Sequence, residues 1–142
     1  MKFLVINGPN LNLLGLREPA IYGSRSFAAL QDFIRASAAD AGVEVDLFQS
    51  NHEGAIVDAI QAAYGVYDGI IINPGAYTHY SYAIYDALRA VDVPAVEVHL
   101  SDIRQRESFR QISVTAPACR GQIMGHGFDG YLEALVLLAE GL

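Results

Sequence analysis

Hydrophobic residues cluster in short runs along the chain, and most runs end at glycine, proline or asparagine. The run KFLVI at Lys2–Ile6 is apolar throughout and stops at Asn7-Gly8-Pro9, a pattern typical of a strand buried on both faces. The same reasoning predicts five strands, at Lys2–Ile6, Val43–Phe48, Gly69–Ile72, Ala95–Leu100 and Gly121–Met124.

Amphipathic stretches separate these runs. Ser26 suits an N-cap, and apolar residues from Phe27 to Ala38 recur at helical spacing until Gly42 ends the helix. Further helices are predicted at Gly54–Tyr64, Ser81–Val91 and Gly130–Ala139, with a short one near Glu107–Phe109. The stretch Asn10–Arg25 has no sustained period and is predicted to be a long loop.

Strands thus alternate with helices, without a linker or an internal repeat. Right-handed crossovers between such units give an open parallel sheet with helices on both faces. We therefore predict one α/β domain over residues 1–142, a flavodoxin-like three-layer sandwich with a five-stranded parallel sheet.

Composition excludes several classes of protein. With 52% hydrophobic and 18% charged residues, the chain is not intrinsically disordered. The net charge of −7 disfavours nucleic acid as a partner. No apolar run reaches ~18 residues, which disfavours a membrane location. Cys119 is the only cysteine and cannot form an internal disulfide, which fits the cytoplasm.

Lys2 is the only lysine and opens a predicted strand, so Schiff-base chemistry is improbable. The eight arginines suit bidentate recognition of carboxylates, although a codon bias toward arginine explains them equally well.

Candidate chemistry lies directly after the strands, at Asn7–Asn10, Ser50–His52, Asn73–Gly75 and His99–Ser101. In open parallel sheets these carboxyl ends meet at one edge, where ligands bind. The sequence therefore predicts a small-molecule site there.

His99 follows Glu97 at a spacing of two, so both side chains point to the same side of a strand. A carboxylate in that position favours a protonated imidazole, as a general acid requires, but an ordinary hydrogen-bonded pair has the same spacing. After them, Ser101 and Asp102 offer backbone N–H groups for a carboxylate, and Arg106 and Arg110 share a face if that segment is helical.

Arg17 and Tyr22 lie in the predicted long loop. A nearby guanidinium lowers the pKa of a phenol from its usual ~10 and makes it a base, although such loop residues are usually surface groups.

Gly125–Gly130 matches GxGxxG, but only twelve residues follow it, so we interpret it as a tight turn rather than a dinucleotide site.

Five segments follow one another along the chain: NGPNLNLLGLREPAIYG at 7–23, QSNHEGAIVDAI at 49–60, NPGAYTHYSYAIYDAL at 73–88, EVHLSDIRQRESFRQIS at 97–113 and GQIMGHGFDGYLEAL at 121–135. Through these segments the chain resembles type II 3-dehydroquinate dehydratases over nearly its whole length. The resemblance implies dehydration of 3-dehydroquinate to 3-dehydroshikimate without metal or cofactor, by a dodecamer built from trimers.

The resemblance also implies residue roles. Tyr22 matches the general base, Arg17 the arginine that activates it, and Asn10 the asparagine that holds a water near the enolate. His99 matches the general acid, with Glu97 behind it. Residues matching the substrate-binding positions are Asn73, Gly75, Ala76, His79, Leu100, Ser101, Arg106, Arg110 and, reaching in from a neighbouring subunit, Asp86.

Four places depart from the family pattern. Asp102 stands where asparagine is expected and adds a negative charge beside the position expected to bind a carboxylate. Tyr80 replaces threonine, Ser26-Phe27 replaces Thr-Leu, and His126 replaces a hydrophobic residue. Two alternatives therefore stay open: a flavodoxin-like module that binds a flavin or nucleotide, and a catalytically silent relative that acts by assembly.

Overall fold

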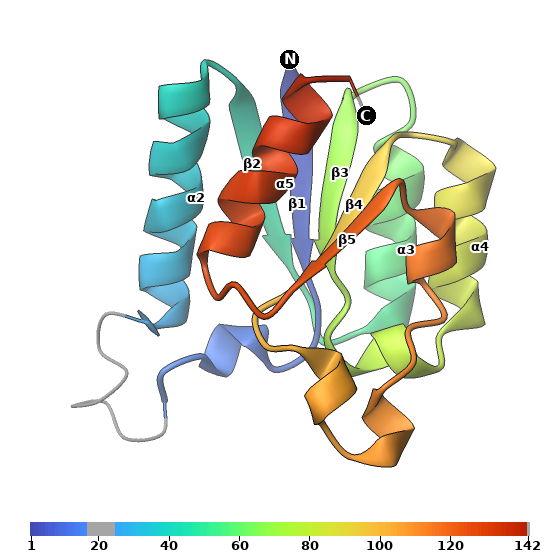
Figure 1. The fold of residues 1–142 in the computed structure, drawn as a ribbon. Coiled ribbons are helices and arrows are strands. Elements are labelled where there is room, and N and C mark those ends of the chain that lie inside the picture. Colours follow the sequence, from blue (N-terminus) through green and yellow to red (C-terminus); the bar gives the residue numbers. More distant parts are fainter. Residues whose placement is uncertain (17–24, 142) are drawn as a thin grey trace.

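The computed structural model describes residues 1–16 and 25–141, and in it five parallel strands form one sheet (Figure 1). The strands are β1 (Lys2–Asn7), β2 (Glu44–Gln49), β3 (Gly69–Asn73), β4 (Ala95–His99) and β5 (Gly121–Met124). Their order across the sheet is β2-β1-β3-β4-β5, which is the flavodoxin-like order. The predicted fold class is confirmed.

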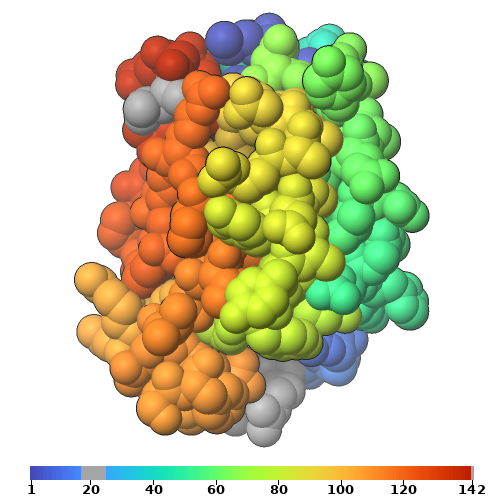
Figure 2. All heavy atoms as spheres, turned by 90° about the vertical axis from the view of Figure 1, so that its right-hand side faces the viewer, coloured from blue at the N-terminus to red at the C-terminus, as the bar shows by residue number. Residues whose placement is uncertain are grey.

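Helices cover both faces of the sheet (Figure 1). On one face α2 (Phe27–Ala41) packs against α5 (Asp129–Ala139), and on the other α3 (Glu53–Ala62) packs against α4 (Tyr82–Val91). Figure 2 looks onto the α4 side, where the orange segment that follows β4 forms one end of the molecule. No helix in the described part of the chain is both long and apolar enough to span a bilayer.

β1 shows why a continuous apolar run indicates a central strand. Phe3 and Val5 belong to the core under α2 and α5, whereas Leu4 and Ile6 belong to the core under α3 and α4. Successive side chains of a strand point to opposite faces, so a strand covered on both sides needs apolar residues at every position.

The predicted helix signals agree with the structure. Ser26 Oγ accepts a hydrogen bond from the backbone N–H of Ala29 at 3.1 Å, and Gly42 ends α2 with a φ of 71°. At the start of α4, Ser81 Oγ accepts from the N–H of Ile84 at 3.1 Å. These contacts are local in sequence, which is why the sequence alone reveals them.

Short 3-10 helices are the main departure from the predicted elements. One of them, η1 (Leu11–Leu13), lies within the predicted long loop, and η3 (Gly75–His79) follows β3. Three more follow β4: η4 (Ile103–Gln105), η5 (Ser108–Arg110) and η6 (Ala116–Ala118). The short helix predicted near Glu107–Phe109 corresponds to η5. The others were not predicted, because a single turn is too short to show a hydrophobic period.

The loops after β1 and β3 lie against each other. Between these two neighbouring strands the order in which the chain adds strands to the sheet changes direction. The backbone N–H of Gly8 donates to the carbonyl of Asn73 at 2.8 Å. A Cβ at Gly8 would lie 2.4 Å from the carbonyl oxygen of Pro74, so only glycine fits this approach. Such a switch point is where open α/β sheets bind ligands.

Candidate active site

A cavity of about 230 Å³ opens at this edge of the sheet. Its walls come from the loops that follow β1, β3 and β4. The lining residues are Leu11, Asn73, Gly75, Ala76, His79, His99, Leu100, Ser101, Ile103, Arg106 and Arg110. The structure therefore brings together all predicted site residues that follow β3 and β4, except Asp86 and the buried Glu97 behind the wall.

Leu11 and Ile103 line the cavity although the sequence did not single them out. Both are apolar, and Ile103 is buried. Their only signal in the sequence is that they stand next to candidate polar residues. They contribute apolar wall rather than polar chemistry.

His99 and Glu97 form a buried pair, as the period of two along β4 predicts. His99 Nε2 lies 2.8 Å from Glu97 Oε2, and the two residues are 5% and 0% exposed. An ionised carboxylate only accepts hydrogen bonds, so Nε2 carries a hydrogen. Nδ1 is then the ring nitrogen left to exchange a proton with a substrate.

Glu97 is charged although it is buried. Burial raises the pKa of this carboxyl, but its hydrogen bonds and the charge of the adjacent imidazole outweigh burial and hold the pKa below its usual range. A carboxyl whose pKa is lowered by folding stabilises the fold above its ordinary pKa of 4.5, and this stabilisation is lost as the pH falls through the folded value.

Glu97→Gln should therefore make the free energy of unfolding less dependent on pH below about 4.5, because glutamine has no charge to lose. Urea denaturation at several pH values measures this dependence. Asp32→Asn removes an exposed carboxylate, whose side chain is 83% accessible, and should leave the dependence unchanged. Equal pH dependence in Glu97→Gln and the unmodified chain would contradict the assignment of a buried charge.

The amide of Asn73 has a defined orientation. Its Nδ2 donates to the hydroxyl of Tyr131 at 3.1 Å, and that hydroxyl donates to Asn7 Oδ1 at 2.6 Å. Its Oδ1 accepts from the backbone N–H of Gly75 at 3.1 Å. Burial raises the pKa of Tyr131, so this phenol is a neutral structural partner and not a base.

His79, at the end of η3, is held in a similar way. Its Nδ1 lies 2.9 Å from the carbonyl oxygen of Ile112. Because a carbonyl only accepts, Nδ1 donates, and the neutral ring offers Nε2 as an acceptor. His79 can therefore accept a hydrogen bond from a ligand hydroxyl.

The end of β4 suits an anionic group. In the described part of the chain, the backbone N–H groups of Leu100 and Ser101 donate to no oxygen. Both residues line the cavity, as do Arg106 and Arg110. Two N–H groups and two guanidinium groups favour a carboxylate on a ligand.

Arg106 and Arg110 would share one face only if the segment were a continuous helix, and it is not. Arg106 lies in extended backbone after η4, and Arg110 ends η5. Glu107 Oε2 lies 2.9 Å from Arg110 Nε, at an angle outside hydrogen-bond geometry, and 4.0 Å from Arg106 Nε. The two arginines reach the same cavity through the bend between two short helices.

Asp102 does not line the cavity, although the sequence predicts a negative charge beside the carboxylate-binding position. Its side chain accepts from Arg104 Nε at 3.0 Å and from a terminal guanidinium nitrogen at 2.9 Å. It also accepts from the backbone N–H of Arg104. These hydrogen bonds lower the pKa of Asp102, and the guanidinium offsets its charge.

We accordingly expect Asp102→Asn to change KM by less than about threefold, because this partly exposed charge lies outside the cavity and is already paired with Arg104. Arg104→Ala should raise KM more, since it leaves the Asp102 charge unpaired, and added salt should reduce that increase. Steady-state kinetics at two salt concentrations measures both effects. A large gain of activity in Asp102→Asn would instead indicate an impaired relative.

Several predicted residues lie outside the cavity. The backbone N–H of Asn10 donates to Asn51 Oδ1 at 2.9 Å, so the Ser50–His52 segment braces the loop after β1 instead of lining the cavity. Asp86 is exposed on α4. Arg17 and Tyr22 lie outside the described residues.

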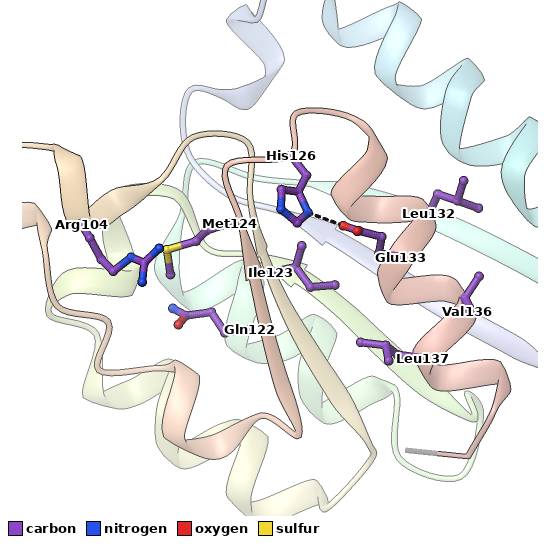
Figure 3. A pocket seen from close by; sticks show the side chains of 9 residues that line it. All are labelled: Arg104, Gln122, Ile123, Met124, His126, Leu132, Glu133, Val136 and Leu137. Atoms are coloured by element: carbon purple, nitrogen blue, oxygen red, sulfur yellow. Dashed lines mark hydrogen bonds and ion pairs between the residues drawn. The ribbon is translucent and has the colours of Figure 1, made fainter.

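A larger hollow of about 740 Å³ lies between β5 and α5 (Figure 3). Its walls are mostly apolar, including Ile123, Leu132 and Val136. The only ion pair drawn there joins His126 Nδ1 and Glu133 Oε2, 2.6 Å apart on its rim. It lacks the converging polar groups of the smaller cavity.

The glycine-rich segment Gly125–Gly130 is a tight turn between β5 and α5. Gly127 has a φ of 57°, and its N–H donates to the carbonyl of Leu100 at 3.0 Å. A Cβ at Gly130 would lie 3.2 Å from a methyl group of Val98. The glycines thus serve packing, which removes the motivation for a nucleotide-binding module.

Among the described residues, no three His, Cys, Asp or Glu side chains are grouped to hold a metal ion.

The chain is similar to known dehydroquinases over almost all of its length. The family model described as Dehydroquinase class II matches residues 1–139. A 3-dehydroquinate dehydratase of Clostridium perfringens (strain ATCC 13124) is 61% identical over 136 residues, covering 95% of this chain and 94% of that one. The crystal structure of a type II dehydroquinase from Butyrivibrio crossotus matches with a TM-score of 0.92 and 55% identity, covering 98% and 97% of the two chains.

Proposed function

Because the chain belongs to the class II dehydroquinase family, we propose that it catalyses the reversible dehydration of 3-dehydroquinate to 3-dehydroshikimate without a cofactor. The observation that carries this proposal is the buried His99–Glu97 pair on the wall of a cavity lined by two arginines and two free backbone N–H groups. An elimination next to a ketone needs a base, a stabilised enolate and an acid for the leaving hydroxyl.

The first step removes a proton from the carbon beside the ketone. We assign this step to Tyr22, with Arg17 as the guanidinium that lowers the pKa of the phenol from its usual ~10. Both roles rest on the family resemblance, as does the role of Asn10 in holding a water that stabilises the enolate. The electron pair of the broken C–H bond moves to the ketone oxygen.

The second step expels the hydroxyl. His99 donates the proton from Nδ1, so that the group leaves as water, while Glu97 stabilises the imidazolium through Nε2. The enolate electrons form the carbon–carbon double bond and restore the ketone. The product is therefore a conjugated enone.

The cavity residues bind the substrate. The backbone N–H groups of Leu100 and Ser101 bind its carboxylate, with Arg106 nearby. Three side chains with the required hydrogen-bonding groups contact the ring hydroxyls, namely Asn73, His79 and Arg110. Gly75 and Ala76 complete the wall, where the absence of long side chains leaves room for a ring.

We further propose that the chain forms one domain over residues 1–142 and assembles in the cytoplasm as a dodecamer built from trimers. Asp86 is exposed on α4 and away from the cavity of its own chain, which supports a role in the site of a neighbouring subunit. The reaction serves the shikimate pathway of aromatic amino acid biosynthesis or quinate breakdown. Sedimentation of the purified protein as a monomer would contradict the assembly.

The test of the activity is direct. Purified protein is mixed with 3-dehydroquinate near neutral pH, and the ultraviolet absorbance of the conjugated product is followed. We expect a rise that scales with enzyme concentration. No rise from protein that circular dichroism shows to be folded would refute the proposal.

A further inference from the structure

Three hydroxyl side chains and one amide surround Glu97 on the side away from the cavity. Ser113 and Thr115 precede η6, Thr78 lies in η3, and Gln122 lies on the edge strand β5 (Figure 3). None of the four lines the cavity. They cannot touch a substrate there, so any effect on the reaction acts through Glu97.

The hydrogen bonds to Glu97 all run toward the carboxylate. Its Oε2 accepts from Ser113 Oγ at 2.7 Å and from Gln122 Nε2 at 2.9 Å, in addition to His99. Its other oxygen accepts from Thr115 Oγ1. The carboxylate thus has four donors.

Counting the hydrogens determines the direction of the remaining contacts. Ser113 and Thr115 each have one hydroxyl hydrogen, and both hydrogens are used on Glu97. Thr78 Oγ1 lies 2.8 Å from each of these hydroxyl oxygens, so Thr78 is the donor, and its single hydrogen serves one of the two contacts at a time. The backbone N–H of Ala116 also donates to Ser113 Oγ, at 3.0 Å. The whole cluster is polarised toward the negative charge.

A proton on Glu97 would disrupt this cluster. If His99 passed its Nε2 proton to Oε2, that oxygen would lose its negative charge and one acceptor site, so it would accept less well from Ser113 and Gln122. This matters because a buried carboxylate beside an imidazolium otherwise tends to take the proton, since the neutral pair needs no solvation of charge. The three donors other than His99 oppose that transfer.

We propose that Ser113, Thr115 and Gln122 are positioning residues that keep Glu97 ionised, so that His99 keeps its Nε2 proton and stays a cation whose Nδ1 can protonate the leaving hydroxyl. The consequence for turnover rests on the proposed dehydration, but the effect on Glu97 does not.

The other titratable group that faces Glu97 is Cys119. Burial and the charge of Glu97 raise the pKa of this thiol to about 12, so it stays neutral. On the cavity side, His79, Arg106 and Arg110 share the pocket with His99.

The test compares Thr115→Val with Thr78→Val. Both changes remove one buried hydroxyl from the same cluster and keep the side-chain shape, but only Thr115 donates to Glu97. With the Glu97 carboxyl carbon labelled, ¹³C NMR follows its protonation. We expect the midpoint to rise by about one pH unit in Thr115→Val and by no more than a few tenths in Thr78→Val.

Turnover supplies the second measurement. In Thr115→Val, kcat should fall about tenfold with KM unchanged, and the alkaline limb of kcat should move to lower pH. Thr115→Ser keeps the donor and should restore both. Gln122→Leu is the variant to use if Thr115→Val does not fold, because Gln122 is exposed on an edge strand and its loss leaves no cavity.

The possible outcomes separate cleanly. Unchanged protonation of Glu97 in both Thr115→Val and Gln122→Leu, or an equal change in Thr78→Val, would overturn the proposal and leave the cluster a purely structural role. If the unmodified protein does not dehydrate 3-dehydroquinate, the proposed function fails, yet the NMR comparison still decides whether the cluster keeps Glu97 charged.

Discussion

His99→Gln is expected to lower kcat by about 10²- to 10⁴-fold, which is the usual contribution of a general acid. The imidazole is on the cavity wall, and its hydrogen bond to Glu97 leaves Nδ1 to donate to the leaving group. Glutamine keeps a donor near the position of Nε2, so Glu97 is not left buried without that partner. The loss of activity should therefore exceed any loss of stability.

Kinetics with 3-dehydroquinate and thermal unfolding of the same preparation test this result. A second measurement assigns the step. In deuterium oxide, the His99→Gln protein should still exchange the hydrogen beside the ketone, because forming the enolate needs the base but not the acid. Near-normal turnover, or the absence of exchange in a folded protein, would contradict this role of His99. His126→Gln is the matched control, since His126 pairs with Glu133 on the rim of the other hollow.

Tyr22→Phe is the second change for which we expect a loss of orders of magnitude. Phenylalanine keeps the ring and removes the only group that we assign to proton abstraction, so kcat should again fall by about 10²- to 10⁴-fold. KM should change little, because the proposed binding contacts come from other residues. The variant should not exchange the substrate hydrogen in deuterium oxide, which distinguishes it from His99→Gln.

Tyr82→Phe is a suitable control for this experiment. Tyr82 is 69% exposed at the start of α4, and its hydroxyl has no assigned role. It should turn over at the normal rate. If Tyr22→Phe retained more than about a tenth of the activity, a different group would have to be the base.

Local signals in the sequence account for the predictions that agree with the structure. Apolar residues at every position of β1 indicate burial on both faces, and Ser26 and Gly42 mark the ends of α2. The spacing of two places His99 and Glu97 on one side of β4. Each of these features depends on residues a few positions apart, whose geometry follows from the period of a helix or a strand.

Irregular local geometry and contacts between distant segments explain what the sequence left open. Asp102 turns toward Arg104, and Arg106 and Arg110 meet the cavity through a bend and not along a helix. Ser50–His52 braces a loop, a role that depends on how the neighbouring strand β1 ends. None of these outcomes has a period that a pattern could reveal.

By itself the sequence determined the α/β class, the order of the elements and the family, because strand and helix periods and contiguous motifs are written in neighbouring residues. Only the tertiary structure decided which donors surround Glu97, since Thr115 lies 18 positions away along the chain and Gln122 reaches the carboxylate from another strand. The physical reason is that the charge state of a buried group depends on the partners that packing brings to it, whatever their distance along the chain.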